Sequence, residues 1–383
     1  MPLFLLDKCA ACSKDLAFNA PRCVRCHVRY CDSTCQHDHW RRGHKQMCKK
    51  IHRGGNAEQY HADKKYKEAV AVAVEACADD TKGQTCYICT QALHWKTKEG
   101  LVRMCSCRGT SGFAHVSCLA EEARILVAEA EENNLHGKVF DERWVRWNIC
   151  GLCKQEYHGV VYCALGWACW KTYVGRPEAN VLRMHSMTTL GNGLRAASQN
   201  RERLGLLESQ FALMQRSRVN REAILATQGN MANCLEDLGR IEDAIELSVQ
   251  VHRSMKALRG NRHTNTIICG LNLAASLQSK GRTTEAQSLA AEYLPISESV
   301  FGPLDVNTLG LRSTYLRARC RDPDISLDDW RKAVSSMDDL YRTAVKVLGT
   351  QHPLTVQCKD DGEASQKALA EIDAQASLEA LAL

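Results

Sequence analysis

The sequence predicts a chain of two parts, in which small cysteine-stabilised α+β domains precede an all-α repeat solenoid. Seventeen of the 21 cysteines lie before residue 170, and most of them occur in closely spaced pairs. The later part repeats itself with a period of 42 residues, which is typical of stacked helical hairpins. We expect the boundary near 175–177 (GRP), where a proline suited to the first turn of a helix precedes a long proline-free stretch.

The composition indicates a folded chain in a reducing compartment. Hydrophobic residues make up 45% and charged residues 25% of the sequence, as in soluble globular proteins. The opening MPLFLLDK reaches Asp7 too early for a secretory segment, and no stretch has the roughly 18 apolar residues of a membrane span. We therefore expect the cytoplasm or the nucleus, where clustered cysteines bind metal more often than they form disulfides.

Residues 9–48 hold eight possible metal ligands in four short pairs. Zinc needs four sulfur or nitrogen donors in a tetrahedron, and one short pair can supply two of them. Two pairs, Cys31/Cys35 and His44/Cys48, have the spacing of one helical face. Because so short a segment hardly buries a core of its own, two ions must supply the missing stability, on the order of 10 kcal/mol each.

The motifs CAAC (9–12), CVRC (23–26), YCDSTCQHDHW (30–40) and GHKQMC (43–48) closely resemble the MYND zinc finger. The resemblance implies two interleaved zinc sites and a module that binds proteins, often through short proline-containing peptides, without catalysing a reaction. The implied sites are Cys9, Cys12, Cys31 and Cys35 for one ion, and Cys23, Cys26, His44 and Cys48 for the other. Three histidines fall outside the pattern, and we expect them at the surface or in packing: His27, His37 and His39.

A second set of eight ligands occupies residues 86–153, in the order four cysteines, one histidine, three cysteines. RING-CH and PHD fingers both use this order. A single residue separates Cys105 from Cys107, seven residues precede His115, and Asn148 stands where PHD fingers have an aromatic residue. These three features favour RING-CH, and the run CSCRGTSGFAHVSCL (105–119) is similar to the core of that family.

The RING-CH resemblance implies two more interleaved zinc sites in which every coordination position is filled by protein, so all four ions are structural. Gly109 and Gly112 would let the chain turn before a helix over residues 115–133. The implied ligands are Cys86, Cys89, His115 and Cys118 for one ion, and Cys105, Cys107, Cys150 and Cys153 for the other.

The first 53 residues are basic, with 11 Lys and Arg against four Asp and Glu. Zinc and its thiolates offset part of this charge, because an ion held by four thiolates carries a net charge of −2. Over the whole chain, four zinc ions and fourteen thiolates bring the formal net charge of +6 to zero. A solvated surface or an acidic protein partner therefore explains the basic segment better than nucleic acid, which we do not expect to bind.

RING-type fingers act as E3 ubiquitin ligases by binding a ubiquitin-loaded E2, so the resemblance raises ligase activity without a covalent catalytic residue as one hypothesis. In RING-type fingers an apolar residue inside the first CxxC of the finger usually belongs to the surface that contacts E2, and the resemblance implies this role for Ile88. The aromatic residue that the family has after the sixth ligand is replaced by Glu122, and Trp144 or Trp147 is a candidate to fold back in its place. The pair of transmembrane helices that usually accompanies RING-CH fingers is missing.

Two further cysteines lie in an aromatic segment after the second cluster. Cys163 and Cys169 are six residues apart, among Trp167, Trp170 and Tyr173. Unpaired cysteine in such surroundings behaves as a small hydrophobic residue. We therefore expect core positions here and no fifth metal site.

The later part repeats a helix–turn–helix pattern. GNMANCLEDLGRIEDAIEL (229–247) aligns with GLNLAASLQSKGRTTEAQSL (270–289), with glycine at 239 and 281 for the turns and alanine at 232, 244, 274 and 286 for close helix contact. Similar corners follow at 259–267, 301–309 and 348–356, with a degenerate copy at 190–202 and an insertion at 318–330. The pattern resembles kinesin-light-chain-like TPR repeats, which implies a groove for a peptide or helix. The alternative is an α-hairpin array without a binding groove.

Together, the patterns predict small zinc-stabilised α+β fingers followed by an all-α TPR-like solenoid. We predict a soluble zinc-binding adaptor in which the MYND and TPR modules select a client protein and the central finger recruits E2. The alternative is a scaffold that binds proteins without ubiquitin transfer. The predicted segments are a MYND-type finger (1–53), a helical linker (54–82), a RING-CH-type finger with an aromatic extension (83–175), TPR-like repeats (176–360) and a C-terminal helix (361–383).

Overall fold

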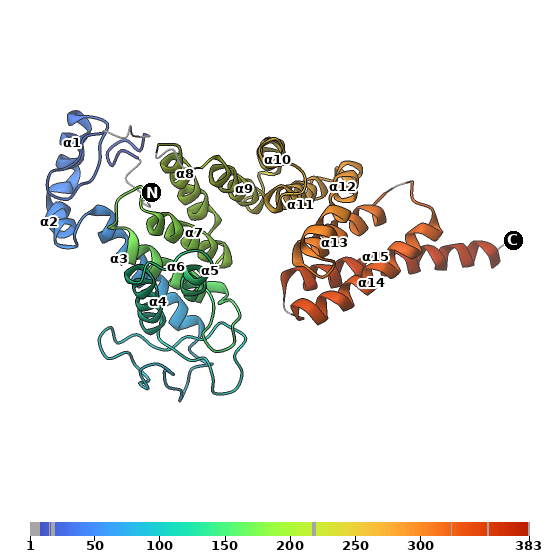
Figure 1. Ribbon diagram of the computed structural model, residues 1–383, viewed down its shortest axis with the longest axis horizontal. Coiled ribbons are helices and arrows are strands. Elements are labelled where there is room, and N and C mark those ends of the chain that lie inside the picture. The colour runs from blue at the N-terminus through green and yellow to red at the C-terminus, as the bar shows by residue number, and fades with distance from the viewer. Residues whose placement is uncertain are drawn as a thin grey trace. The chain divides into compact units, whose positions relative to one another are not determined.

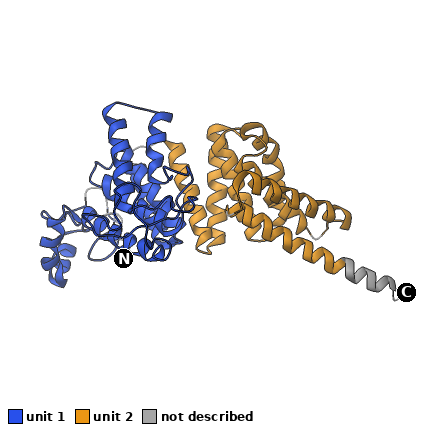
Figure 2. Ribbon diagram, turned by 90° about the horizontal axis from the view of Figure 1, so that it is seen from below, with its two compact units in different colours: residues 1–219 blue, residues 220–383 orange. Residues whose placement is uncertain are grey.

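A computed structural model of the chain describes residues 8–381, apart from 15, 17–19, 217–219, 323 and 351; it describes no side chain for 216 or beyond 372. The chain forms two compact units, Met1–Val219 and Asn220–Leu383 (Figure 2). The predicted division into five segments is finer than this, and it stays a prediction.

The first finger is built from short helices around buried cysteines. Its helices are α1 (Ser33–His39), the π-helical turn η1 (Trp40–His44) and α2 (Lys45–Arg53). The carboxylate of Asp32 accepts a hydrogen bond from the N–H of Cys35 at 2.8 Å and so caps α1. Cys31 precedes this cap, so the prediction that Cys31 and Cys35 share one helical face is wrong.

Unit 1 is organised around one helix that is buried on all sides, α6 (Gly159–Tyr173). It packs against α3 (Ala57–Ala76), α4 (Val116–Glu132) and α7 (Val181–Ala196), which Figure 1 labels. Glycines bring α6 and α7 close together, because a Cβ at Gly193 would lie 2.8 Å from the carbonyl oxygen of Tyr162. The aromatic segment thus forms a core that the second finger shares through α4. Helix α5 (Lys138–Trp144) and the 3₁₀ turn η2 (Val145–Trp147) lie between α4 and α6 in the chain. Helix α8 (Asn200–Arg216) follows α7.

The predicted β content of the fingers is not found in the residues that the structure describes. They contain only isolated bridges, Arg22 with Arg29, Val102 with Ala114, and Ile149 with Glu156. Two of these bridges close the loops around Cys23 and Cys150, where the chain reverses over too few residues to extend a ladder. Short turns between metal ligands therefore take the place of a sheet.

Unit 2 is a stack of helical hairpins, as predicted. Its helices are α9 (Arg221–Asp237), α10 (Ile241–Arg259), α11 (Thr264–Ser279), α12 (Thr283–Phe301), α13 (Val306–Cys320), α14 (Leu327–Leu348) and α15 (Pro353–Leu381). The four alanines predicted at close contacts are all buried, at 232, 244, 274 and 286. The two predicted turn glycines have positive φ, 76° at Gly239 and 82° at Gly281.

The later repeats follow the same plan with local changes. Gly260, Gly302 and Gly349 end α10, α12 and α14, each with positive φ. The predicted insertion falls between α13 and α14, and residues 361–381 continue α15 rather than start a new helix. The degenerate copy at 190–202 spans the end of α7 and the start of α8, where Ser198 has φ of 56° in place of glycine. No helix in the described part of the chain has the length and apolarity needed to cross a bilayer.

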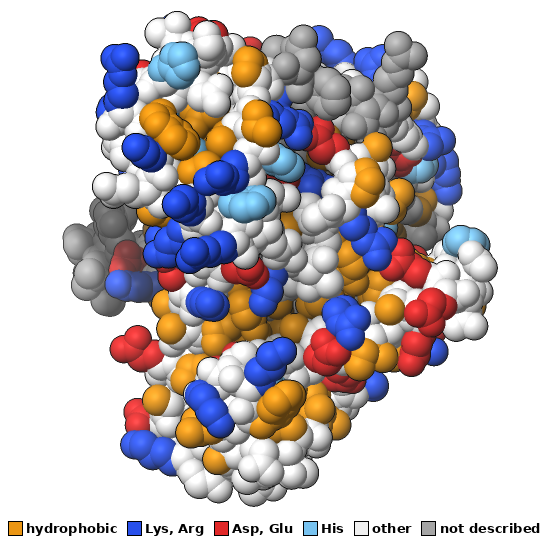
Figure 3. All heavy atoms as spheres, turned by 90° about the vertical axis from the view of Figure 1, so that its left-hand side faces the viewer, with side chains coloured by type: hydrophobic (Ala, Val, Ile, Leu, Met, Phe, Trp, Pro, Cys, Tyr) orange, Lys and Arg blue, Asp and Glu red, His pale blue; other side chains and the backbone are white. Residues whose placement is uncertain are grey.

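Charge is unevenly spread over the molecular surface. On the face drawn in Figure 3, Lys and Arg side chains gather over the upper part, above a hollow in which hydrophobic atoms are visible. Exposed hydrophobic side chains of the first finger include Val24, Trp40 and Met47.

The buried guanidinium of Arg183 ties α7 to α3. It donates to Glu58 Oε1 at 2.8 Å and to the carbonyl oxygens of Val174 and Arg176, and its side chain is only 4% exposed. Replacing Arg183 by alanine would leave the Glu58 carboxylate without its partner, so we expect a loss of about 3 kcal/mol in the free energy of unfolding of unit 1. Urea denaturation followed by circular dichroism measures this loss. Arg201→Ala, at an exposed position of α8, is the control and should change stability by less than about 0.5 kcal/mol; equal effects of the two variants would contradict the assignment.

Candidate metal centres

All four CxxC motifs fold into the same tight turn, which we call the knuckle. In each one the N–H of the residue after the second cysteine donates to the carbonyl of the first cysteine, at 2.8–3.0 Å. The N–H of the first cysteine donates to the carbonyl five residues later, at 2.7–3.0 Å. The residue after the second cysteine always has positive φ, between 58° and 63°, and these residues are Ser13, His27, Thr90 and Lys154. His27 is thus a turn residue, not a ligand.

The knuckle also favours ionisation of its first cysteine. Burial raises the pKa of Cys9, but hydrogen bonds from backbone N–H groups, Cys12 first, outweigh burial and lower this pKa to about 6. The same competition lowers the pKa of Cys150 to about 7, with the N–H groups of Cys153 and Leu152 as donors, and it lowers the pKa values of Cys23 and Cys86. Each knuckle therefore favours the thiolate of its first cysteine, the form of cysteine that binds metal.

The first group of donors belongs to the first finger and is only partly buried. The sulfur of Cys12 lies 3.5 Å from that of Cys31 and 3.8 Å from that of Cys35. The N–H of Cys31 points to the sulfur of Cys9 at 3.4 Å. The four predicted ligands Cys9, Cys12, Cys31 and Cys35 thus converge on one point.

The second group is fully buried in the same finger. Cys23 and Cys48 have their sulfurs 3.7 Å apart, and the sulfur of Cys26 lies 3.3 Å from Nε2 of His44. The ring of His39 stacks on His44 with centroids 4.7 Å apart, and its Nδ1 lies at hydrogen-bond distance, 3.0 Å, from the hydroxyl of Tyr30. His39 therefore packs behind a ligand, while His37 is exposed, as expected for histidines outside the motif.

The third group joins the second finger to the start of α4. Nδ1 of His115 lies 3.4 Å from the sulfur of Cys89 and 3.6 Å from that of Cys118, and Cys86 completes the group. Nε2 of His115 contacts the carbonyl oxygen of Ala92 at 3.3 Å. A hydrogen bond to this carbonyl requires the proton on Nε2, which leaves Nδ1 free to bind metal.

The fourth group contains Cys105, Cys107, Cys150 and Cys153, with the sulfurs of Cys107 and Cys150 at 3.7 Å. The loop between its ligands is held by Arg103, which donates to Asp80 at 2.6 and 2.8 Å and to the carbonyl of Gly109 at 2.6 Å. Gly109 and Gly112 both have positive φ, as predicted. A Cβ at Gly112 would lie only 2.6 Å from the Cβ of Cys107.

The donors fit zinc in number, chemistry and spacing. Zn–S bonds of about 2.3 Å in a tetrahedron place two sulfurs about 3.8 Å apart, close to the distances found in the four groups. A disulfide would need about 2.05 Å, and none of the 21 cysteines takes part in a disulfide. In each group the donor atoms lie within 4.8 Å of one another. The chain therefore binds four zinc ions, and protein side chains fill the four coordination positions of each ion, which makes the ions structural.

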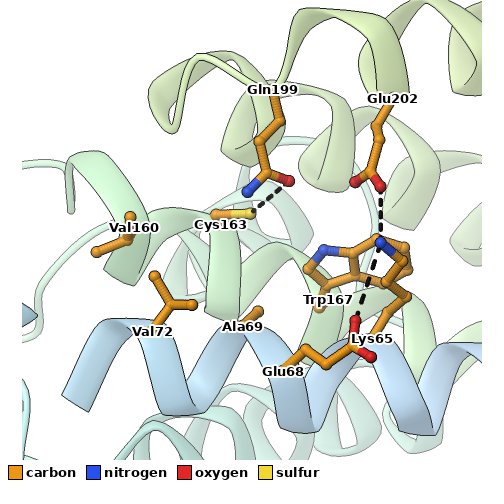
Figure 4. A pocket seen from close by; sticks show the side chains of 9 residues that line it. All are labelled: Lys65, Glu68, Ala69, Val72, Val160, Cys163, Trp167, Gln199 and Glu202. Atoms are coloured by element: carbon orange, nitrogen blue, oxygen red, sulfur yellow. Dashed lines mark hydrogen bonds and ion pairs between the residues drawn. The ribbon is translucent and has the colours of Figure 1, made fainter. Parts of the chain in front are cut away.

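The other cysteines of unit 1 belong to its core. Cys169 is completely buried, and burial raises its pKa well above the usual range. Cys163 lies beside a hollow of about 200 Å³ between α3 and α6, where its sulfur is 4.0 Å from Oε1 of Gln199 (Figure 4). Burial raises the pKa of Cys163 to about 12. Neither thiol lies in a donor group, so the prediction of core positions is confirmed.

The residues predicted around the E2 contact lie in different environments. Ile88 stands at the tip of its knuckle with 39% of its surface exposed. Leu152 has the same place in the Cys150 knuckle and is 49% exposed. Trp147 is fully buried, and Trp144 packs against Phe140 and Tyr173. Neither tryptophan replaces the missing aromatic residue, because both take part in the core that α4 and α6 share.

A fifth knuckle escaped the sequence analysis. The N–H of His94 donates to the carbonyl of Glu99 at 3.0 Å, the N–H of Lys98 donates to the carbonyl of His94 at 2.9 Å, and Lys98 has φ of 60°. This segment, HWKTKE (94–99), matches a CxxC knuckle position by position, with His94 and Thr97 in place of the cysteines. The spacing of the segment could have indicated this turn, but His and Thr are not a usual pair of zinc ligands, so the sequence analysis passed over it.

Comparisons with known families agree with these modules. The family model of the MYND finger matches residues 9–48, that of the RING-variant domain matches 86–133, and that of the tetratricopeptide repeat matches 223–299. These geometries and matches define a zinc-finger protein with helical repeats. More particularly, the chain carries a MYND finger, a RING-variant finger and TPR repeats.

Known proteins similar over a longer stretch are distant. No curated protein matches the chain. Its structure is similar to the nearly identical TPR-like repeats of a kinesin light chain-type protein from Podosopora anserina, with 18% identity, a TM-score of 0.38, and coverage of 62% of this chain and 99% of that one. It is also similar to BtubC (BKLC) from P. vanneervenii, with 11% identity, a TM-score of 0.33, and coverage of 67% and 92%.

A methyl group at position 112 should disrupt the fourth zinc site. Gly112→Ala places its Cβ against Cys107, so we expect the variant to lose one zinc ion per chain and to unfold at a lower temperature. Gly109→Ala is the matched control, because Gly109 also has positive φ but nothing lies within 4 Å of its added Cβ. Elemental analysis of both purified variants measures the difference. Full zinc content in Gly112→Ala would show that the loop is not packed as described.

Proposed function

We propose that this protein is a zinc-dependent adaptor whose central finger recruits a ubiquitin-loaded E2, while its MYND finger and TPR repeats bind the client protein. The observation that carries the proposal is an exposed apolar side chain, Ile88, on a turn that two zinc-binding cysteines and a backbone hydrogen bond hold in place. Apolar anchors on rigid turns are favourable contact points, since little conformational entropy is lost on binding.

The surroundings of Ile88 bring both ends of the second finger together. The N–H of Tyr87 donates to the carbonyl of Phe113 at 2.9 Å. Tyr87 also lies within electrostatic range of Glu122 and Cys150; after burial, their negative charges help raise its pKa. Leu152 belongs to the knuckle of Cys150, which lies within electrostatic range of Tyr87. A second exposed apolar residue therefore stands on a turn near the one that carries Ile88.

An ion pair occupies the place of the family's aromatic residue. Arg146 donates to the carboxylate of Glu122 on α4, and its side chain is only 15% exposed. The guanidinium also lies over Gly151, where any added Cβ would collide with it. A partner would therefore meet a charged patch between α4 and the last knuckle, and this favours an E2 with complementary polar groups over one that requires an aromatic contact.

The protein supplies position and the E2 supplies chemistry. All zinc positions are filled by protein donors, which leaves no open site for water. The reactive thioester is carried by the E2, so the contribution of this chain is to hold that E2 near a client bound to another module.

The alternative is a scaffold that binds proteins without ubiquitin transfer. The Glu122–Arg146 pair favours it, because a carboxylate paired with an arginine stands where RING-CH fingers have the aromatic residue that faces E2.

Removing the apolar anchor should weaken E2 recruitment. We expect Ile88→Ala to lower the rate of autoubiquitination at least tenfold in an assay with a panel of E2 enzymes. Val139→Ala removes a more exposed apolar side chain, 49% against 39% for Ile88, on α5 and should leave the rate unchanged. Zinc content is measured for both variants.

Two results decide against parts of the proposal. If wild-type protein that holds four zinc ions is inactive with every E2, the scaffold alternative is correct. If Ile88→Ala is as active as the wild type, E2 binds elsewhere on the finger.

A further inference from the structure

We infer that the fifth knuckle keeps the shape of a zinc knuckle without binding metal. It presents Trp95 beside a basic groove as a docking site for an acidic segment of a partner protein. This site is separate from the proposed E2 contact and does not depend on ubiquitin transfer.

A hydrogen-bonded pair takes the place of the metal. Nδ1 of His94 lies 2.8 Å from Oγ1 of Thr97 and accepts the N–H of Thr97 at 3.1 Å. In the Cys86 knuckle the first ligand is contacted from one position earlier in the turn, by the N–H of Ile88, which points to the sulfur of Cys86 at 3.4 Å. The Nδ1 atom of His94 is thus occupied by hydrogen bonds where the cysteine sulfur of a zinc knuckle would bind metal. The turn is therefore fixed in the same shape as its metal-binding counterparts.

The knuckle is anchored on the third zinc site and on α4. The ring of His94 is nearly buried and lies edge-on to the ligand His115, with centroids 5.3 Å apart. Glu99, the last residue of the knuckle, accepts hydrogen bonds from the N–H of Ser117 at 2.7 Å and from its hydroxyl at 2.9 Å. This carboxylate caps the first turn of α4. The tip of the knuckle thus stands on a rigid base.

The tip exposes an aromatic side chain that the fold does not use. Trp95 is 67% exposed, more than any other tryptophan among the described residues, and Leu93 next to the knuckle is 59% exposed. Exposed apolar residues also stand at the tips of three zinc knuckles, at Val24, Ile88 and Leu152. Tryptophan is enriched among binding hot spots, and on a preorganised turn its burial gains much while its immobilisation costs little.

A groove of about 530 Å³ lies beside this tip. Its floor includes Tyr66, Ala120 and Ala168, and its walls carry three cations and one carboxylate. These charged residues are Lys96, Arg124, Lys171 and Glu121. With Glu121 beside Arg124 and Asp63 beside Lys171, the charges leave an excess of one cation, Lys96, which suits an acidic group, and Trp95 suits an apolar residue next to it.

The carboxylates near the groove are already engaged. Glu121 accepts two hydrogen bonds from Arg124, at 2.6 and 2.9 Å. Asp63 lies 3.6 Å from the ammonium of Lys171, which also stands over the ring of Tyr66 at 4.4 Å. An incoming acidic residue would therefore meet Lys96 first, at the knuckle itself. Such an exposed contact adds selectivity and speed of binding more than affinity, so the anchor remains Trp95.

The groove and the E2 contact use different faces of α4. Glu121 and Arg124 line the groove, whereas Glu122 pairs with Arg146. Successive residues on a helix point about 100° apart, so the two sets of side chains point in different directions.

A peptide array tests the inference with the full-length, zinc-loaded protein. The probes are short peptides with a central Leu, Phe or Gly flanked by acidic, neutral or basic residues. We expect peptides with acidic flanks and an apolar centre to bind best, with affinity that falls as salt rises. Trp95→Ala should weaken this binding at least tenfold, and Lys96→Glu at least threefold. Val139→Ala is the control and should bind as the wild type does.

A third variant separates the tip from its support. Thr97→Val keeps the shape of the side chain but removes the hydroxyl contact to His94, so Trp95 remains while the knuckle loosens. We expect weaker peptide binding with unchanged zinc content. The inference is overturned if acidic flanks give no preference, or if Trp95→Ala, with its four zinc ions retained, binds the peptides as well as the wild type. Loss of E2-dependent activity in Ile88→Ala without loss of peptide binding would show that the two sites are distinct; loss of both would contradict this.

Discussion

Attraction between divalent cations and closely packed thiolates is the interaction on which this structure depends. Each group brings four donor atoms within 4.8 Å of one another. Such an array does not ionise fully by itself. The hydrogen bond with Cys12 is the main cause that raises the pKa of Cys31 to about 11. Burial, followed by hydrogen bonds to the other thiols of the group, raises the pKa of Cys35 to about 12. A zinc ion removes this conflict and adds on the order of 10 kcal/mol per site. Among the described residues of the first finger, the buried cluster contains, apart from cysteines, Val28, Tyr30, Ile51 and Ala57, too few to replace the metal.

The metal sites also position the rest of unit 1. The third site fixes His115 and Cys118 at the start of α4, and the buried face of this helix then packs on α6. The Glu99 carboxylate and the Tyr66 hydroxyl both meet Ser117 in the same turn, which links the fifth knuckle and α3 to the zinc site. Zinc binding and the helical core are therefore coupled, and the turns that present Ile88 and Trp95 inherit their rigidity from this coupling.

Spacing predicted those features that depend on neighbours in sequence. The ligand groups, the roles of Gly109 and Gly112, the helix after His115 and the repeat period all follow from short-range patterns that the structure reproduces. Other features depend on contacts between distant segments and could not be predicted. Examples are the burial of Trp147 in the core, the pairing of Arg146 with Glu122, and the absence of strands in the described part of the fingers. The knuckle at His94 was missed because a hydrogen bond does there what zinc does elsewhere.

Native mass spectrometry of the purified full-length chain tests the central claim most directly. The intact ion should carry four zinc ions, and stepwise chelation should remove them together with the thermal unfolding transition of unit 1. A chain that is free of metal yet folds cooperatively, or one whose mass shows cysteines joined as disulfides, would contradict the account.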